Sequence, residues 1–237
     1  MLNGFSINYL MKLYRLLLKH TDIYPVSMLP EIDKGVILRH DIDFDIRPSL
    51  AVADLEYNMG IRSTYYIQLS SPYYNPLSND NTKFIHRLLN QNHEIGLHYD
   101  PTVYNRGFSS ERNILEILID DDVKSVSLHN PSIHGKYPTF ENIINTYDWD
   151  AFSDDNYFSD SCFKRQLDIN KIEEKAQTGV VQLLLHPELY CVYDEYDLDH
   201  IDASIYDVTD DVIKNYSDKL LGDMGKYDAY KEHRRTN

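Results

Sequence analysis

Apolar residues along this chain follow two different spacings. Continuous apolar runs of roughly four to eight residues are typical of buried strands, whereas apolar residues three and four positions apart indicate helices that cover a sheet. The runs predict strands over residues 35–41, 63–69, 94–99, 123–129 and 180–187. The helical spacing predicts helices over residues 49–60, 82–92 and 109–121, the last with Ser110 as its N-cap. This alternation predicts a parallel sheet with helices outside it, as either an open sheet or a barrel.

The pattern is weaker at both ends of the chain and after residue 130. The amphipathic segment 5–20 predicts a helix of the domain rather than a signal peptide, because polar residues interrupt its apolar run and no small-residue cleavage site follows. Further on, we expect a short helix at 139–147, a short strand at 149–154 and a closing helix at 208–224. No linker, internal repeat or low-complexity segment divides the sequence, which predicts one domain over residues 1–237.

The composition disfavours several classes of function. The chain has 38 Asp and Glu against 23 Lys and Arg, and this acidic excess disfavours nucleic acids and other polyanions as partners. The 2 cysteines form neither a disulfide framework nor a metal-ligand spacing, as is typical of a reducing compartment. No run approaches the roughly 18 apolar residues of a membrane span, so we expect a soluble cytoplasmic protein. The 20 tyrosines are compatible with a sugar-binding groove, because their rings combine apolar faces with a polar tip.

Histidines stand at the ends of four of the predicted strands. They occur in the segments VILRHDID, EIGLHYD, SVSLHNP and LLLHPE, as His40, His98, His129 and His186. In parallel α/β folds the active site is built at the C-terminal ends of the strands, where the loops converge. One histidine at a strand end is more often a structural residue, but four at the same edge favour a shared site.

Two aspartates follow His40 in the first of these segments. Asp41 and Asp43 are two positions apart in an extended segment, so both carboxylates are expected on the same side. Two anions that close repel each other unless a cation compensates them. A divalent metal held by one aspartate and by imidazoles would remove the repulsion and leave the other aspartate as a base. Mixed His and Asp ligands favour Zn²⁺, with other transition metals as alternatives.

The order of these motifs resembles that of the polysaccharide deacetylases, the NodB-like carbohydrate esterase family 4. RHDID resembles the first motif of the family, HEIGLHYD the second, SLHNPS the third, YFSDSCF the fourth and LLLHPE the fifth. The spacing is similar in particular to the WbmS-like branch, which is associated with bacterial surface-polysaccharide gene clusters. The resemblance covers residues 35–190 and implies a distorted (β/α)7 barrel and a metal-dependent carbohydrate N-deacetylase.

The resemblance also implies roles for individual residues. Asp41 would be the general base, Asp43 and His98 metal ligands, and His186 the general acid. Asp160 would orient His186 or the substrate. In such a mechanism a metal activates water for attack on an acetamido group, and the products are acetate and an amino sugar.

The chain departs from the family pattern at two positions. Thr102 stands where many members have a second ligand histidine, and His129 stands where the third motif usually has arginine. We therefore expect His129 to complete the metal site, with Asp100 as the alternative third ligand. Arg39 lies on the same strand face as Asp41 and is expected to take over the task of the missing arginine.

Three neighbouring positions complete the expected site. A backbone N–H in the loop after Pro131 is expected to bind the oxyanion. His40 lies on the opposite strand face from Asp41, where it either supports the base or only packs. Asp45 is expected to be a loop or cap residue before the next helix.

The expected substrate is an acetylated amino sugar, either nucleotide-linked, lipid-linked or in an oligosaccharide, used in bacterial surface-polysaccharide synthesis of the O-antigen type. Loops 71–81, 100–108 and 130–160 would determine its specificity. Three alternatives stay open: a glycosyltransferase that binds a metal through Asp-x-Asp, a metal-dependent phosphoesterase, and a non-catalytic carbohydrate-binding relative. The sequence has no Lys or Arg cluster for a phosphate, and its Asp-x-Asp ends the first strand instead of following a nucleotide-binding scaffold.

Overall fold

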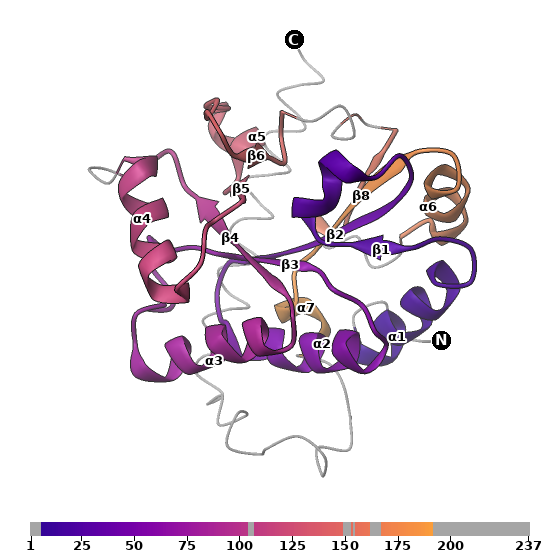
Figure 1. Ribbon diagram of the computed structural model, residues 1–237, viewed down its shortest axis with the longest axis horizontal. Helices are drawn as coiled ribbons and strands as arrows, with labels where there is room; N and C mark the ends of the chain where they lie inside the picture. The colour runs from indigo at the N-terminus through magenta and orange to yellow at the C-terminus, as the bar shows by residue number, and fades with distance from the viewer. Residues whose placement is uncertain (1–5, 104–106, 149–152, 154, 162–166, 192–237) are drawn as a thin grey trace.

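One curled sheet of parallel strands forms the centre of the protein, with helices around it (Figure 1). The computed structural model describes residues 6–103, 107–148, 153, 155–161 and 167–191. The hydrogen-bonded order of the strands is β6-β5-β4-β3-β2-β8-β7, and β1 pairs with β2 beside this path. The strands are β1 (Ile23–Tyr24), β2 (Gly35–Ile42), β3 (Thr64–Ile67), β4 (Glu94–Tyr99), β5 (Ser125–Leu128), β6 (Ile144–Asn145), β7 (Tyr157–Ser159) and β8 (Val180–Leu185).

Strand β2 lies in the middle of this sheet and is buried along its whole length. It pairs with β3 on one side and with β8 on the other, so that His40 is opposite both Tyr65 and Leu185. Burial on both faces explains why this strand is a nearly continuous apolar run, as is typical of parallel sheets. Arg39, His40 and Asp41 are therefore charged or polar groups inside the core, and each must find partners there.

Most of the helices cover the outer face of the sheet. The helices are α1 (Ile7–Leu17), the 3₁₀-helix η1 (Val26–Glu31), α2 (Arg47–Asn58), α3 (Asn79–Asn90), α4 (Phe108–Ile119), α5 (Pro131–His134), α6 (Ile169–Ala176) and α7 (Glu188–Cys191). Helix η1 packs against Ile37 and Tyr66 on the inner face, and α5 follows β5. One apolar cluster joins α1, α2 and α6 to β2 and β8, and a second joins α2, α3 and α4 to β3, β4 and β5. In Figure 1, α1, α2 and α3 follow one another along one side of the sheet.

The inner face of the sheet is curled enough for side chains to bond across it. Arg39 of β2 donates to Ser127 of β5 at 2.9 Å, although β3 and β4 lie between these strands in the sheet order. Gln182 of β8 likewise reaches the carbonyl of Thr146, just after β6, at 3.3 Å. Within the described residues no pairing joins β6 to β7, so the barrel stays open there. The expected distorted (β/α)7 barrel is confirmed.

Most of the predicted elements are present with small shifts of their ends, but two predictions were wrong. Ser110 is not a cap, because α4 begins earlier and Gly107 is its N-cap residue. The segment 139–147 is not a helix: Asn142 has a left-handed φ of 57°, and Ile144–Asn145 pair with β5 as strand β6. An amphipathic spacing in so short a segment is outweighed by the backbone partners that a sheet edge offers.

Two other predicted elements lie mostly or completely outside the described residues. The strand expected at 149–154 lies almost entirely outside the described residues, and the neighbouring strand in the structure is β7. The closing helix expected at 208–224 lies outside them completely. Helix α6, capped by the Asp168 side chain on the amide of Lys171, was missed. None of the described helices combines the length and apolar character that crossing a membrane requires.

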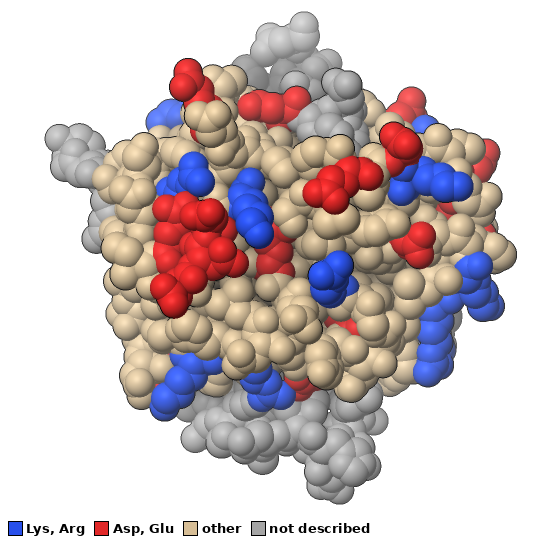
Figure 2. All heavy atoms as spheres, in the orientation of Figure 1, with Lys and Arg blue, Asp and Glu red and all other residues tan. Residues whose placement is uncertain are grey.

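Figure 2 shows charged side chains of both signs on one face of the molecule, with one larger patch of Asp and Glu at the left of the view and Lys and Arg dispersed. Lys and Arg lie among Asp and Glu there, and the described residues drawn on that face form no continuous basic stripe. A polyanion such as nucleic acid requires a positive surface along its backbone.

Candidate metal centre and active site

Three side chains from three different strand ends meet at the C-terminal edge of the sheet. Asp43 follows β2, His98 is in β4, and His129 follows β5; one potential ligand atom from each lies within 4.8 Å of the others. His98 Nε2 is 3.0 Å from Asp43 Oδ1, and His129 Nδ1 is 3.5 Å from the same oxygen. The two imidazole nitrogens are 3.2 Å apart. The structure thus brings together the set Asp43, His98 and His129 that the sequence predicted.

The hydrogen bond that His98 makes on the side away from Asp43 indicates which of its ring nitrogens carries the proton. His98 Nδ1 lies 3.3 Å from the carbonyl oxygen of Ser127, which can only accept a hydrogen bond, so Nδ1 carries the proton. In a neutral imidazole Nε2 then has a lone pair directed at the carboxylate of Asp43, and the two repel unless a cation or a proton lies between them. One carboxylate oxygen and two imidazole nitrogens form a donor set that suits Zn²⁺ and leaves positions for water or substrate.

Electrostatics keep Asp43 in the ionised form that a metal ligand needs. Burial raises its pKa, but hydrogen bonds from His129 and His98, together with the charges of His129 and His186, outweigh burial and hold that pKa well below its usual range. Burial lowers the pKa of His129, and Asp43 raises it by more, so that the net shift is upward. In the absence of a metal, protonated imidazole is the group that compensates this carboxylate.

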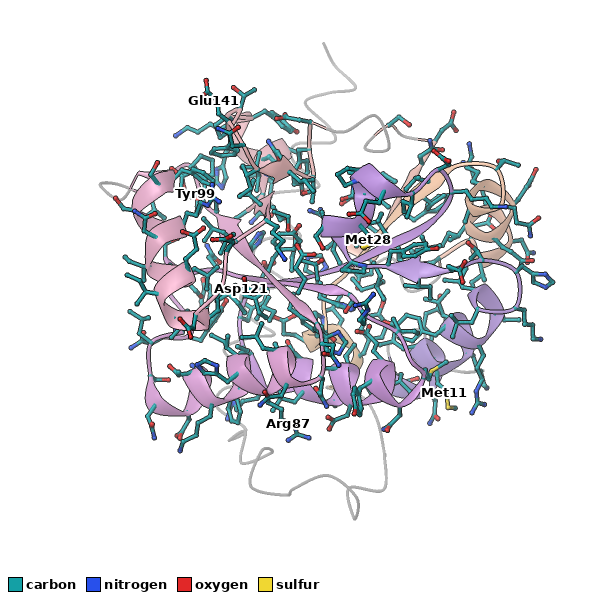
Figure 3. The ribbon with its side chains drawn as sticks, viewed as in Figure 1. Met11, Met28, Arg87, Tyr99, Asp121 and Glu141 are labelled. Carbon is teal, nitrogen blue, oxygen red and sulfur yellow. The ribbon has the colours of Figure 1, made fainter. Side chains whose placement is uncertain are left out.

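Asp100, the alternative third ligand, is directed elsewhere. Its Oδ1 accepts hydrogen bonds from the amide of Thr102 at 2.8 Å and from the Thr102 hydroxyl at 2.6 Å. These bonds close a turn after β4, as aspartate commonly does. Tyr99, between His98 and Asp100, points to the outer face (Figure 3), where its ring contacts Phe108, the first residue of α4. The geometry therefore favours His129 over Asp100.

Asp41 lies deeper than Asp43 and is only 2% exposed. Its Oδ2 accepts a hydrogen bond from the Ser127 hydroxyl at 2.8 Å and lies 3.8 Å from Arg39 Nη2. The same oxygen is 3.9 Å from His98 Nδ1. Among the described residues, Asp41 Oδ1 is buried with no hydrogen-bond partner. A buried carboxylate oxygen without a partner is costly, which suggests that water or substrate completes its surroundings.

Arg39 is fully buried beside Asp41, as the sequence predicted for the two residues on one strand face. It donates to Ser127 at 2.9 Å, to Thr146, and to the hydroxyl of Tyr147 at 3.3 Å. Its guanidinium also lies over the rings of Tyr66 and Tyr147. Arg39 is thus a fixed positive charge beside the Asp41 carboxylate.

His186 and Asp160 form a pair at the ends of β8 and β7. His186 Nδ1 is 2.6 Å from Asp160 Oδ1, and the His186 amide donates to Asp160 Oδ2 at 2.9 Å. The other ring nitrogen, Nε2, lies 3.9 Å from Asp43 Oδ2. Burial lowers the pKa of His186, but the charge and hydrogen bond of Asp160 outweigh it and raise that pKa well above its usual value. His186 is therefore held as a proton donor directed at the candidate metal centre.

His40 does not belong to this centre, so only three of the four strand-end histidines converge. It points to the outer face of β2, where His40 Nε2 lies 2.7 Å from Glu56 Oε1 of α2. The ring stacks on Tyr65 with 4.5 Å between ring centroids. Of its two expected roles, the contacts of His40 match packing within a buried polar network. Asp45 also lies outside the centre and binds Arg47 in the first turn of α2, as expected for a loop or cap residue.

Glu188 contacts the centre and was missed as a site residue. Its Oε1 accepts hydrogen bonds from the amides of Asp43 at 2.9 Å and Phe44 at 3.1 Å. Burial, and then the charge of Asp43, raise the pKa of Glu188 to about 8. The only signal in the sequence was its place two residues after His186 in LLLHPE. Nothing in a spacing pattern reveals a contact between residues 43 and 188.

The turn after β5 contains the amide that sequence reasoning placed after Pro131. The amides of Ile133, His134 and Gly135 donate to the carbonyls of Asn130 and Pro131, and Pro131 has no amide hydrogen. Within the described part of the chain, the amide of Ser132 has no such bond. Ser132 is therefore the candidate oxyanion donor among these residues.

Exposed aromatic side chains lie on the loops that leave the same edge of the sheet. Tyr73 is 45% exposed in the loop after β3 and contacts Phe44, with ring centroids 5.2 Å apart. Tyr137 is 48% exposed after α5 and lies 6.3 Å from the ring of Tyr147. Flat aromatic faces of this kind stack on the apolar faces of sugar rings.

Comparison with known proteins finds similarity in structure alone. No protein-family model and no curated protein matches the chain. A carbohydrate esterase family 4 esterase of Streptococcus mutans is 14% identical, with a TM-score of 0.49 over 78% of this chain and 85% of that one. The peptidoglycan deacetylase PdaC of Bacillus subtilis is 16% identical, with a TM-score of 0.44 over 86% of this chain and 97% of that one.

A third similar structure is a family 4 pseudoenzyme from Bacillus anthracis, 14% identical with a TM-score of 0.45. The match covers 69% of this chain and spans only 58% of the length of that protein. Both active and inactive proteins therefore occur among the similar structures, and the function of this chain has to be argued from its own site.

Proposed function

We propose that this protein is a metal-dependent carbohydrate N-deacetylase of the polysaccharide deacetylase superfamily. The observation that carries the proposal is the convergence of Asp43, His98 and His129 beside the His186–Asp160 pair. A metal-ligand set and a proton donor at one strand edge are the two requirements of metal-assisted hydrolysis. The five motifs that resemble carbohydrate esterase family 4 support the same class of reaction.

Asp43, His98 and His129 would hold the metal, for which Zn²⁺ fits this donor set best. When bound, the ion supplies Lewis acidity and makes water more acidic. Two further hydrogen bonds orient these ligands. The Ser127 carbonyl keeps the proton of His98 on Nδ1, and Glu188 accepts a hydrogen bond from the amide of Asp43. Such outer contacts orient ligands and tune their basicity.

The chain's own residues would move the protons of the reaction. Asp41, which lies beside Arg39, would take a proton from the attacking water, whose oxygen forms the new bond to the amide carbon. The amide of Ser132 would stabilise the oxyanion, a contribution of roughly 3–4 kcal/mol per donor. His186 Nε2 would then give a proton to the amine nitrogen as the C–N bond breaks, while Asp160 stabilises the imidazolium.

The substrate that we propose is an acetylated amino sugar, nucleotide-linked, lipid-linked or within an oligosaccharide, for bacterial surface-polysaccharide synthesis. The resemblance to the WbmS-like branch supports this context, and exposed Tyr73 and Tyr137 could stack on sugar rings beside the site. The cytoplasmic location expected from the sequence stays a prediction.

The geometry weighs against the glycosyltransferase alternative. Such enzymes use both carboxylates of Asp-x-Asp around one metal–nucleotide complex, whereas here only Asp43 joins the candidate metal set. Asp41 is buried and bonded to Ser127. The non-catalytic alternative is decided by the assay below.

The test is acetate release from acetamido sugars by the purified protein loaded with Zn²⁺. We expect activity in the wild type, and a loss of about 10²–10⁴-fold in Asp41→Asn at unchanged metal content, because general-base catalysis is typically of this size. Elemental analysis of both proteins checks the metal. Stoichiometric metal with equal rates in wild type and Asp41→Asn would identify a non-catalytic relative, and turnover of UDP-sugars alone would identify a glycosyltransferase.

A further inference from the structure

The backbone that carries Asp43 lies beyond the last hydrogen bonds of the sheet. Pairing of β2 with β8 ends at His40, and pairing with β3 ends at Ile42. Inside a strand the pleat decides which way each side chain points, but this constraint stops where the ladder stops. Another group must therefore determine the direction in which the Asp43 carboxylate points.

Glu188 provides that constraint. One of its oxygens, Oε1, accepts both the amide of Asp43 at 2.9 Å and the amide of Phe44 at 3.1 Å. The side chain is nearly completely buried, with 1% of the residue exposed. Its second oxygen has no hydrogen-bond partner among the described residues. Hydrogen bonds in a dry environment are strong and directional, so the two bonds to this one oxygen restrain the 43–44 peptide.

The same contact joins two loops that carry different parts of the site. Glu188 is the first residue of α7 and stands two positions after His186, whereas Asp43 follows β2. His186 Nε2 is 3.9 Å from Asp43 Oδ2. Movement of the Glu188 carboxylate would therefore change both the direction of Asp43 and its distance from His186.

We propose that Glu188 is a positioning residue that holds the Asp43–Phe44 backbone so that the Asp43 carboxylate points into the metal centre at a set distance from His186. The inference rests on the proposed function, because it assigns Glu188 to the same centre. It predicts that the acceptor oxygen at position 188 matters for metal affinity, apart from any contribution of its volume to packing.

The experiment compares Zn²⁺ dissociation constants, measured by competition with a chromogenic chelator, for four proteins. Glu188→Gln keeps an acceptor oxygen at this position and is expected to stay within about threefold of wild type. Glu188→Met keeps the volume without a strong acceptor and is expected to bind about 10–100-fold more weakly, the usual effect of losing a contact behind a ligand. Glu116→Gln is the matched control. The Glu116 side chain also accepts a hydrogen bond from a backbone amide, that of Val123 before β5.

Equal affinity in wild type and Glu188→Met would overturn the inference, as would a loss in Glu188→Gln as large as in Glu188→Met. Should Glu188→Met fail to fold, Glu188→Asp takes its place, since its shorter side chain cannot reach both amides. It is expected to weaken binding several-fold, and unchanged affinity in it would overturn the inference.

A second measurement separates this inference from the proposed function. Hydrogen exchange at the amides of Asp43 and Phe44 in the metal-free protein should be slow in wild type and Glu188→Gln and at least about tenfold faster in Glu188→Met. Protection that depends on residue 188 in a protein that never binds metal would support the backbone contact while refuting the proposed function. Equal exchange rates of these two amides in wild type, Glu188→Gln and Glu188→Met would refute the positioning role, whether or not the protein is a deacetylase.

Discussion

Two clusters of histidine and carboxylate, one on β2 and one just beyond its end, are built from similar groups and differ in their surroundings. On the outer face, His40 and His93 surround Glu56. At the end of the strand, His98 and His129 surround Asp43. The side chains of the outer cluster are fully buried, whereas those of His129 and Asp43 are 19% and 14% exposed, so the inner cluster is open to solvent or substrate on one side.

The difference lies in which groups satisfy the carboxylate of each cluster. In the outer cluster, hydroxyl groups donate to both oxygens of Glu56: Tyr14 at 2.6 Å on Oε1, and Ser63 at 2.6 Å and Tyr65 at 2.9 Å on Oε2. In the inner cluster, the imidazole nitrogens of His98 and His129 face each other and the same carboxylate oxygen. The outer carboxylate has its donors within the protein, whereas the inner groups require a cation or protons.

Removal of the Asp43 carboxylate should have the largest effect on metal binding and activity. It disrupts the inner cluster and leaves the outer cluster intact. Asp43→Ala is expected to lose its bound metal and at least about 10³-fold of deacetylase activity, because one of three ligands and the charge that neutralises the ion are lost. Elemental analysis and acetate release measure the two effects. Asp45→Ala is the control, since Asp45 binds only Arg47 among the contacts described above. Full metal content in Asp43→Ala would show that the ion, if any, binds elsewhere.

Removal of Glu56 should act on stability instead. Glu56→Ala leaves His40 and three hydroxyl groups without their buried acceptor, and breaking a buried pair typically costs about 3–5 kcal/mol. Urea denaturation measures the loss of unfolding free energy. Under conditions in which Glu56→Ala is folded, it should bind Zn²⁺ with wild-type affinity. A loss of metal affinity with unchanged stability would mean that the outer cluster is part of the site and that our comparison is wrong.

The pH dependence of stability should report the outer cluster as well. Burial raises the pKa of Glu56, but His40, His93 and Ser63 lower it by more, to about 2 from a usual value of 4.5. The folded protein therefore binds fewer protons than the unfolded chain in this range, and the contribution of Glu56 to stability is complete above about pH 4.5 and declines as the pH falls towards 2. At about 1.4 kcal/mol per pKa unit, the contribution is on the order of 3 kcal/mol.

His93 extends the same trend to higher pH. Burial lowers the pKa of His93 below its usual 6.5, although Glu56 acts in the opposite direction. The unfolded chain therefore takes up this proton first, and stability should begin to fall as the pH drops below about 6.5. Urea denaturation of the wild type and of Glu56→Gln between about pH 7 and pH 2.5 checks both effects. The decline below pH 4.5 should be shallower in the variant, and parallel curves there would contradict the assignment to Glu56.

The smallest effect is expected for Asp100→Ala, which sharpens the boundary of the inner cluster. Asp100 bonds Thr102 in a surface turn, so its loss should cost about 1 kcal/mol of stability and leave the metal content unchanged. Elemental analysis beside His129→Ala, which should lose the metal, completes the comparison. The opposite pattern, with metal lost in Asp100→Ala and kept in His129→Ala, would make Asp100 the third ligand.

Much of the fold followed from the sequence because its strongest signals are local. The buried run of β2 and the six residues 94–99 of β4 could be recognised from apolar residues between turns. The segment 139–147 was misread, since a short amphipathic stretch takes its structure from the strand beside it. The roles of individual side chains were harder to predict than the elements that carry them.

The sequence by itself determined that His98, His129 and His186 reach one edge of the sheet, because parallel strands bring their C-terminal ends together. It also determined that Asp41 and His40 face opposite sides, because strand geometry alternates. Only the tertiary structure decided that His40 meets Glu56, and that Glu188 holds the backbone of Asp43. These contacts depend on how helices and loops pack across the sheet, and packing between distant segments leaves no periodic pattern in the chain.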